Sequence, residues 1–245
     1  PVILLFDKSF SAFCQGWKDK RLWKAGILCG IPLFLACNLQ QLGLVDTDAG
    51  KSAFLTAMYI VIVPVIGIFL KKKPSVMMPV SIALAVAGLY CISCVGVTRI
   101  STGDLLTIGC AFMFAVQIIF VDKYAARVDS LRLNAIQALV CSVLSGTITI
   151  FTETPTWSAI TACALPLAHA GFLSMGAAYA LQIIGQKNVE PTTAALIMSS
   201  ESVFALLFGI LLLNEPIDLW KGIGCALLFT AVVLSQIPVK SKSAV

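Results

Sequence analysis

Residues 52–70 read SAFLTAMYIVIVPVIGIFL, and no charged side chain interrupts them. At 1.5 Å per residue, a helix over these residues is about 30 Å long, which matches the hydrocarbon core of a bilayer. Polar and apolar residues do not alternate here, as they do in the strands of a membrane barrel. The stretch therefore predicts a transmembrane helix.

Further apolar runs of similar length lie on either side of 52–70, and short segments rich in Gly, Pro, Asn and Asp join them. The chain is 59% hydrophobic and 12% charged, whereas soluble domains are about 45–50% apolar and about 25% charged. This composition excludes a disordered chain, argues against a soluble globule and predicts an all-α polytopic membrane protein. The other helices are expected at 25–45, 76–97, 103–121, 131–151, 162–186, 192–213 and 218–238.

The basic residues indicate how the chain is oriented. With alternating crossings, all of the 17 Lys and Arg residues except Lys51, Arg99 and Lys221 fall on the same side as residues 7–24. Because basic loops stay in the cytoplasm, this asymmetry predicts a multi-pass protein of the cell membrane, such as a bacterial inner membrane, with a cytoplasmic C-terminus. The net charge of +5 reflects this topology, and no nucleic-acid partner is expected.

The chain matches itself without gaps at a shift of 142 residues. Ten of the 39 positions from 36 to 74 are identical to their equivalents at 178–216, and Gln40 with Gln182 is one of the identical pairs. The shift places the helix at 52–70 on 194–212, which is the fifth predicted span after it. The equivalent helices therefore cross the membrane in opposite directions, and such inverted repeats are typical of secondary transporters.

The repeat also predicts the domain organisation. Residues 1–9 fall on 143–151, so the first repeat lacks a counterpart of residues 103–142. We therefore expect a design of five plus five transmembrane helices, truncated here at the N-terminus to about eight full helices. The predicted domains are a first repeat at 1–97, without its first helix and most of its second, and a second repeat at 98–245.

Three stretches resemble a known family. They are GLVDTDAGKSAFLTAMYIVIVP at 43–64, NVEP at 188–191, and the segment from SESVFA at 200–205 to LNEP at 213–216. These stretches look like EamA-type carriers of the drug/metabolite transporter superfamily. Ser202 stands where the family commonly has Pro after the Glu, and Lys72 and Lys73 stand where the first repeat often has an acidic residue.

The resemblance implies a ten-helix carrier that works by alternating access. Its solute would sit in a central cavity lined by the third, fourth, eighth and ninth helices, together with the first and sixth. Many relatives export amino acids or other small metabolites, and some are thought to use a proton gradient. We therefore expect a secondary transporter that exports a small organic metabolite, such as an amino acid, across the cytoplasmic membrane. We expect it to be a monomer or a homodimer, with membrane lipids as further partners.

Glu201 is the candidate for ion coupling, because it is the carboxylate nearest the centre of a predicted span. Polar groups in spans are costly and usually face a wet cavity or the bundle interior. Two interpretations remain open for this side chain. It couples transport to protons or captures a cationic group, or it is a hydrogen-bonded structural residue that joins the repeats.

Other polar residues within the predicted spans are candidates to line a solute cavity. Cavity lining and interhelical hydrogen bonding are both open for each of them, and small residues such as Ser199 also permit close helix packing. Tyr179 and Gln182 lie three residues apart, on one helix face. The cavity candidates are Asn38, Gln41, Thr56, Tyr59, Gln117, Tyr179, Gln182 and Ser199.

Two rival functions come from other classes: an intramembrane enzyme, such as a lipid-modifying enzyme, and a membrane scaffold that transports nothing. An enzyme needs a nucleophile, a base or a metal cluster, and the single His with one buried Glu is a poor constellation. We expect no catalytic residue, cofactor or metal. The phosphate-binding motif of ATPases, Gly-x-x-x-x-Gly-Lys-Ser/Thr, does not occur, so the chain alone does not predict a primary pump.

Overall fold

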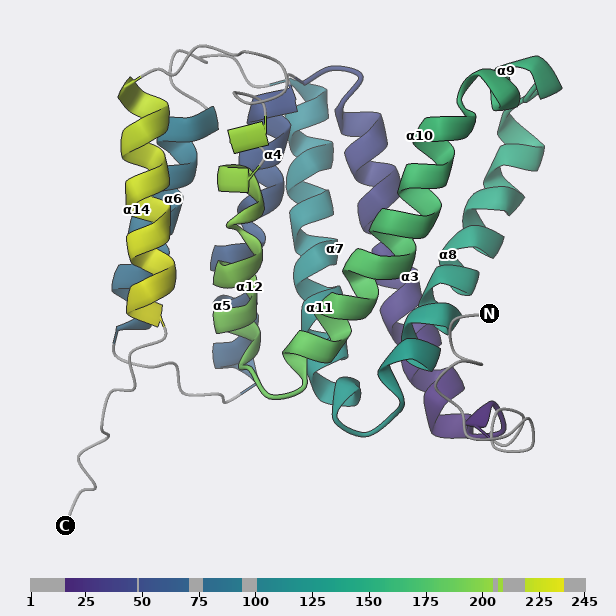
Figure 1. Ribbon diagram of the computed structural model, residues 1–245, viewed down its shortest axis with the longest axis horizontal. Coiled ribbons are helices and arrows are strands. Elements are labelled where there is room, and N and C mark those ends of the chain that lie inside the picture. The colour runs from purple at the N-terminus through teal and green to yellow at the C-terminus, as the bar shows by residue number, and fades with distance from the viewer. Residues whose placement is uncertain are drawn as a thin grey trace. The chain divides into compact units, whose positions relative to one another are not determined.

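The computed structural model describes residues 16–47, 49–70, 77–93, 101–204, 207–208 and 219–235. The regular elements of this part of the chain are all helical, which confirms the predicted all-α fold class (Figure 1). They are α3 (Lys20–Gly43), α4 (Ala49–Ala57), α5 (Tyr59–Phe69), α6 (Met78–Ser93), α7 (Thr102–Ala125), α8 (Ser130–Thr152), α9 (Trp157–Ala162), α10 (Ala164–Ala168), η1 (His169–Ala178), α11 (Tyr179–Gln186), α12 (Pro191–Met198) and α14 (Leu219–Ser235).

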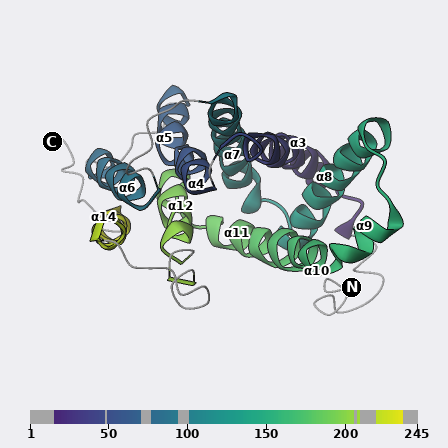
Figure 2. The same cartoon turned by 90° about the horizontal axis from the view of Figure 1, so that it is seen from above.

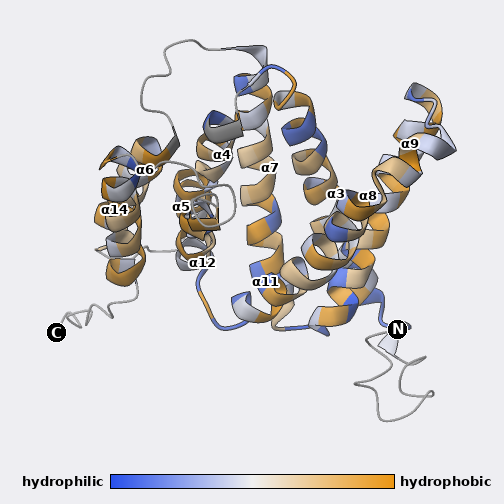
Figure 3. Ribbon diagram, turned by 45° about the horizontal axis from the view of Figure 1, so that its top comes forward, coloured by the Kyte–Doolittle hydropathy of each residue, from blue (hydrophilic) through white to orange (hydrophobic). Residues whose placement is uncertain are grey.

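Five helical segments within the described ranges are long and apolar enough to cross a membrane. Apolar residues dominate their length, and hydrophilic residues gather towards the connections (Figure 3). The helices α6 and α14 are apolar but shorter, and the predicted helix at 192–213 is described only in part. The five long segments are Lys20–Gly43, Lys51–Phe69, Thr102–Ala125, Ser130–Thr152 and Ala164–Gln186.

Two of the predicted spans are less regular than the sequence suggests. The span at 52–70 is interrupted by a turn at Met58, which separates α4 from α5. The span at 162–186 contains η1, a ten-residue stretch in which the helix widens to π geometry. Stretches of π-helix inside α-helices are uncommon and often accompany function, and hydrophobicity alone does not predict them.

Local sequence explains several helix ends. The Asp129 carboxylate accepts a hydrogen bond from the backbone N–H of Arg132 at 2.8 Å and caps the start of α8. Thr156 caps α9 in the same way. Pro191 occupies the first turn of α12, where its missing N–H would have no helical partner.

The chain forms two compact units, and each is described by itself. Unit 1 comprises residues 1–35 and 116–189, and unit 2 comprises residues 36–115 and 190–245. Each unit takes residues from both sides of the predicted boundary at 97/98. The units are therefore not the two repeats, and the repeat boundary stays a prediction.

Unit 1 packs α3, α7, α8 and α11 around one apolar core. Glycines on α3 allow its backbone to approach α8 closely. A Cβ on Gly26 would lie 2.3 Å from Ile136, and a Cβ on Gly30 would lie 2.8 Å from Val140. The core is made of Leu22, Ala25, Cys29, Val121, Ala125, Leu133, Ile136 and Ile183.

Unit 2 contains a close helix pair, α6 and α14, which lie side by side in Figure 2. Gly88 and Gly224 make the contact possible, because a Cβ on either residue would lie less than 3 Å from the carbonyl oxygen of the other. Within the same unit, α12 packs against α5 and α14. In Figure 1, α5 and α12 run in opposite directions, as an inverted repeat requires.

Candidate functional site

Several predicted site residues meet in unit 2, where the span at 52–70 is interrupted. Tyr59 is the first residue of α5 and is buried, and Glu201 is the first residue after the turn that follows α12. α5, which begins at Tyr59, packs against α12, which ends three residues before Glu201. Glu201 itself is exposed at the surface of its unit. A carboxylate in this place can receive a proton or a cationic group.

Ser199 lies beside Glu201 but already uses its hydroxyl proton. It is 1% exposed, and its Oγ donates to the backbone carbonyl of Leu196 at 2.6 Å. Serine hydroxyls that bond back to the helix in this way tend to bend it. The side chain therefore shapes the end of α12, and its role in contacting a solute stays a prediction.

The polar residues of α3 lie in different surroundings. Gln40 contacts the span at 52–70, where its Nε2 donates to Thr56 Oγ1 at 3.3 Å. Gln41 is exposed, and Asn38 is half-buried. Helix residues one apart face different directions, and the roles of Asn38 and Gln41 in lining a cavity stay predictions.

The other predicted residues lie in unit 1. Gln117 is fully buried on α7, and its Oε1 accepts a hydrogen bond from Gln182 Nε2 on α11 at 3.1 Å. The Nε2 atom of Gln117 is buried without a hydrogen-bond partner. Tyr179, half-buried, begins α11 directly after η1. A buried amide donor without a partner is costly, so this atom is suited to a water or to a carbonyl group of a solute.

A buried amide network around η1 did not figure among the predicted residues. Asn134 Nδ2 donates to the carbonyls of Met175 and Gly176 at 3.0 and 3.1 Å, and Gln137 Nε2 donates to Asn134 Oδ1 at 2.9 Å. The network holds α8 to the widened turns of η1. Two amides three residues apart on one helix face are the signal that could have found it.

A second cluster in unit 2, also outside the prediction, joins the starts of α4 and α7. Asp104 is 2% exposed and pairs with Lys51, whose Nζ lies 2.5 Å from Oδ2. Thr47 Oγ1 donates to Oδ1 at 3.0 Å, and the Ser101 N–H donates to Oδ2 at 2.7 Å. The carboxylate is well satisfied by these partners, which suits a structural clasp between the two helices.

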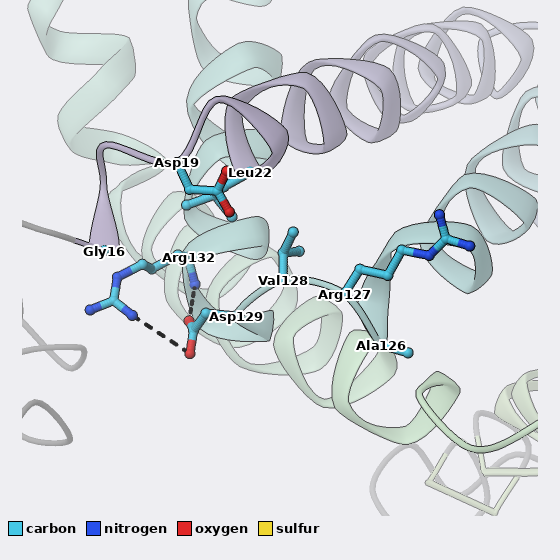
Figure 4. A pocket seen from close by; sticks show the side chains of 8 residues that line it. All are labelled: Gly16, Asp19, Leu22, Ala126, Arg127, Val128, Asp129 and Arg132. Carbon is cyan, nitrogen blue, oxygen red and sulfur yellow. Dashed lines mark hydrogen bonds and ion pairs between the residues drawn. The ribbon is translucent and has the colours of Figure 1, made fainter.

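A pocket of about 430 Å³ opens in unit 1 between the start of α3 and the turn from α7 to α8. Figure 4 shows Asp129 beside Arg132 there, while Arg127 extends in another direction. Arg132 NH1 and Asp129 Oδ2 are 3.7 Å apart. None of the predicted site residues lines this pocket, and its acidic and basic side chains balance one another.

The residues that the structure describes offer little to a metal ion. Within those ranges no three His, Cys, Asp or Glu side chains lie close enough together to bind one. None of the described cysteines takes part in a disulfide bond. The chemistry available at the candidate site is therefore that of one carboxylate, hydroxyls and amides.

Comparisons with known proteins agree with this membrane architecture. The model of the EamA-like transporter family matches residues 101–236. An uncharacterized transporter from Archaeoglobus fulgidus is 30% identical over 231 residues, which are 94% of this chain and 73% of that protein. A solved crystal structure with 16% sequence identity covers 89% of this chain and 77% of that chain with a TM-score of 0.73, so the two share a fold.

Proposed function

The chain belongs to the EamA-like transporter family, and from this premise we propose that it is a secondary transporter that exports a small organic metabolite, such as an amino acid, by alternating access. The protein is a multi-pass membrane transporter, whose partners are a small-molecule solute and membrane lipids. The export direction, the solute class and the mechanism are our proposals.

The observation that carries this proposal is the place of Glu201. Among the described carboxylates in spans, Asp104 and Asp122 lie near the two ends of α7, whereas Glu201 lies near the middle of the predicted helix at 192–213. No basic side chain of the described ranges forms an ion pair with it. An intramembrane carboxylate without a counter-charge is costly, and ionisable residues in such places commonly mark substrate or ion pathways and proton relays. We propose that Glu201 couples transport to protons.

The remaining predicted residues are proposed to contact the solute. Tyr59 and Thr56 lie near the interruption of their span, and Gln117 offers a buried amide donor. Asn38, Gln41, Tyr179, Gln182 and Ser199 complete the proposed set. One fused pair of repeats holds both halves of an alternating-access transporter, so either a monomer or a homodimer suffices. We place the protein in the cell membrane with its C-terminus in the cytoplasm, because of its basic loops.

Flux through proteoliposomes tests the proposal. Purified protein is reconstituted with a proton gradient, and a panel of amino acids and other small metabolites is screened for accumulation. We expect at least one solute to move at a rate that the gradient increases and a protonophore abolishes. Conversion of membrane lipid without any solute movement would instead favour an intramembrane enzyme, and the absence of both would favour a scaffold.

A further inference from the structure

The two repeat-equivalent spans are interrupted at the same place. α4 begins at Ala49 and α12 begins at Pro191, and these positions are equivalent under the shift of 142 residues. α4 ends before a turn at Met58, and α12 ends before a turn at Ser199 and Ser200. Met58 and Ser200 are equivalent under the same shift. Both repeats therefore break one span at a matching position.

Three backbone hydrogen bonds at the first turn have equivalents at the second turn. At each turn an amide bonds to the carbonyl three residues earlier, instead of four, as in a short 3₁₀ segment. These three bonds recur although the side chains differ, and the second turn has a further bond from the Ser202 N–H to the Ser199 carbonyl at 3.2 Å. The equivalent bonds are Met58 N–H to Leu55 O (3.2 Å) with Ser200 N–H to Ile197 O (3.1 Å), Val61 N–H to Met58 O (2.9 Å) with Val203 N–H to Ser200 O (3.0 Å), and Ile62 N–H to Met58 O (3.2 Å) with Phe204 N–H to Ser200 O (3.1 Å).

A side chain supports the second turn in a way that the first turn lacks. A three-residue bond from the Ser200 amide leaves the Leu196 carbonyl without that amide, and Ser199 Oγ donates to this carbonyl instead. Ala57 is the equivalent of Ser199 in the first repeat and has no hydroxyl. The break in the second repeat is therefore held by a side chain, and the break in the first repeat is not held in this way.

Tyr59 and Glu201 are also equivalent under the shift, and each directly follows its break. They belong to one unit, in which α5, which begins at Tyr59, packs against α12, which ends three residues before Glu201. A pseudo-two-fold axis relates the repeats of an inverted-repeat transporter. In such a structure, a residue lies near its equivalent in the other repeat only if both residues lie beside the axis. The geometry thus places both breaks next to the axis.

We infer that the two breaks form one joint, in which Tyr59, Ser199 and Glu201 are positioning residues that make the turn in one repeat respond to the turn in the other. The inference rests on the proposed function, because alternating access requires the repeats to exchange conformations. A 3₁₀ turn has poorer hydrogen-bond geometry than an α-helix, so its conversion to α-helix requires little free energy. Hinges of moving helices need this property.

Hydrogen exchange measured by mass spectrometry on the full chain in lipid nanodiscs tests the joint. Ser199→Ala frees the Leu196 carbonyl to accept the Ser200 amide in a regular helical bond. We expect exchange at 200–204 to slow by roughly fivefold, the scale of one hydrogen bond. We also expect exchange at 58–62, in the other repeat, to slow. The control is Thr230→Ala, because Thr230 Oγ1 makes the same kind of bond to Ala226 O (2.7 Å) in the uninterrupted α14.

A change confined to 196–204 in Ser199→Ala would overturn the joint, as would an equal change at 58–62 in Thr230→Ala. If Ser199→Ala does not fold, Tyr59→Phe provides the reciprocal test, with the altered exchange expected at 200–204. Unaltered exchange there would then reject the inference. The measurement needs no solute, so it is independent of whether proteoliposome flux is found. Conversely, a result showing that the two breaks do not influence each other would not contradict the proposed transport function.

Discussion

At the level of single residues, Glu201 carries the most specific prediction. We expect Glu201→Gln to reduce gradient-driven flux by roughly tenfold or more, because contacts to a charged group are worth about 1.5–3 kcal/mol. The amide has nearly the same shape but does not exchange a proton. The dependence of flux on pH should disappear together with the rate. Both are measured as initial rates in proteoliposomes at several external pH values.

The matched control is Glu153→Gln, which removes a carboxylate from an exposed position after α8. This variant should transport like the wild type. Flux with unchanged rate and pH dependence in Glu201→Gln would refute the coupling role. The alternative that Glu201 is a structural residue would then remain, and it would appear as a loss of thermal stability instead.

Asp104 carries a prediction about stability. Because Asp104 and its partner Lys51 are largely buried, Asp104→Asn should destabilise the protein by roughly 3 kcal/mol by leaving a buried charge without its counter-charge. Thermal unfolding in detergent measures this. Asp46 is an exposed carboxylate on the connection between α3 and α4, so Asp46→Asn should have little effect on the unfolding temperature. Equal unfolding temperatures for both variants would show that the clasp does not stabilise the fold.

Among the helices, the contact of α6 with α14 depends on two glycines. A Cβ on Gly224 would lie 2.6 Å from the Gly88 carbonyl and 2.7 Å from Ile92, so Gly224→Ala forces the helices apart. We expect a loss of about 1–3 kcal/mol. Gly222 lies on the same helix with nothing within 4 Å of an added Cβ. Gly222→Ala should therefore be neutral or stabilising by roughly 0.5–1 kcal/mol.

The comparison of melting temperatures for the two alanine variants checks this contact. If Gly224→Ala were as stable as Gly222→Ala, close backbone packing would not hold the pair. The sequence also predicted where the helices lie along the chain, because long apolar runs need hydrocarbon around them. It did not predict the turn at Met58, since methionine is a good helix former. Only packing against α12 and the backbone bonds reveal that break.

For the whole molecule, the basic loops predict an orientation that cysteine labelling can check. Thr154→Cys and Asn188→Cys place thiols in exposed connections before α9 and after α11. An impermeant maleimide should label position 154 in intact cells and position 188 only after the membrane is permeabilised. Mass spectrometry separates these sites from the native cysteines. The opposite pattern would invert the proposed topology.

The site could be predicted only in part. The sequence singled out Glu201, Tyr59 and Gln117 as candidates because polar residues within apolar runs stand out by composition alone. It missed Asn134 and Gln137, whose importance depends on the carbonyls that the widened turns of η1 present to Asn134. It did not show that Gln40 contacts Thr56, because the side chain that faces a neighbour depends on how two helices pack.

The sequence by itself determined the helical membrane class, the positions of the spans and the family, because hydrophobic length and motif are local properties of the chain. Its internal match also related Tyr59 to Glu201 as equivalent positions. Only the tertiary structure decided that both positions follow a break and that α5 packs against α12. Backbone turns and contacts between distant residues depend on packing, whose geometry a hydrophobic pattern does not encode.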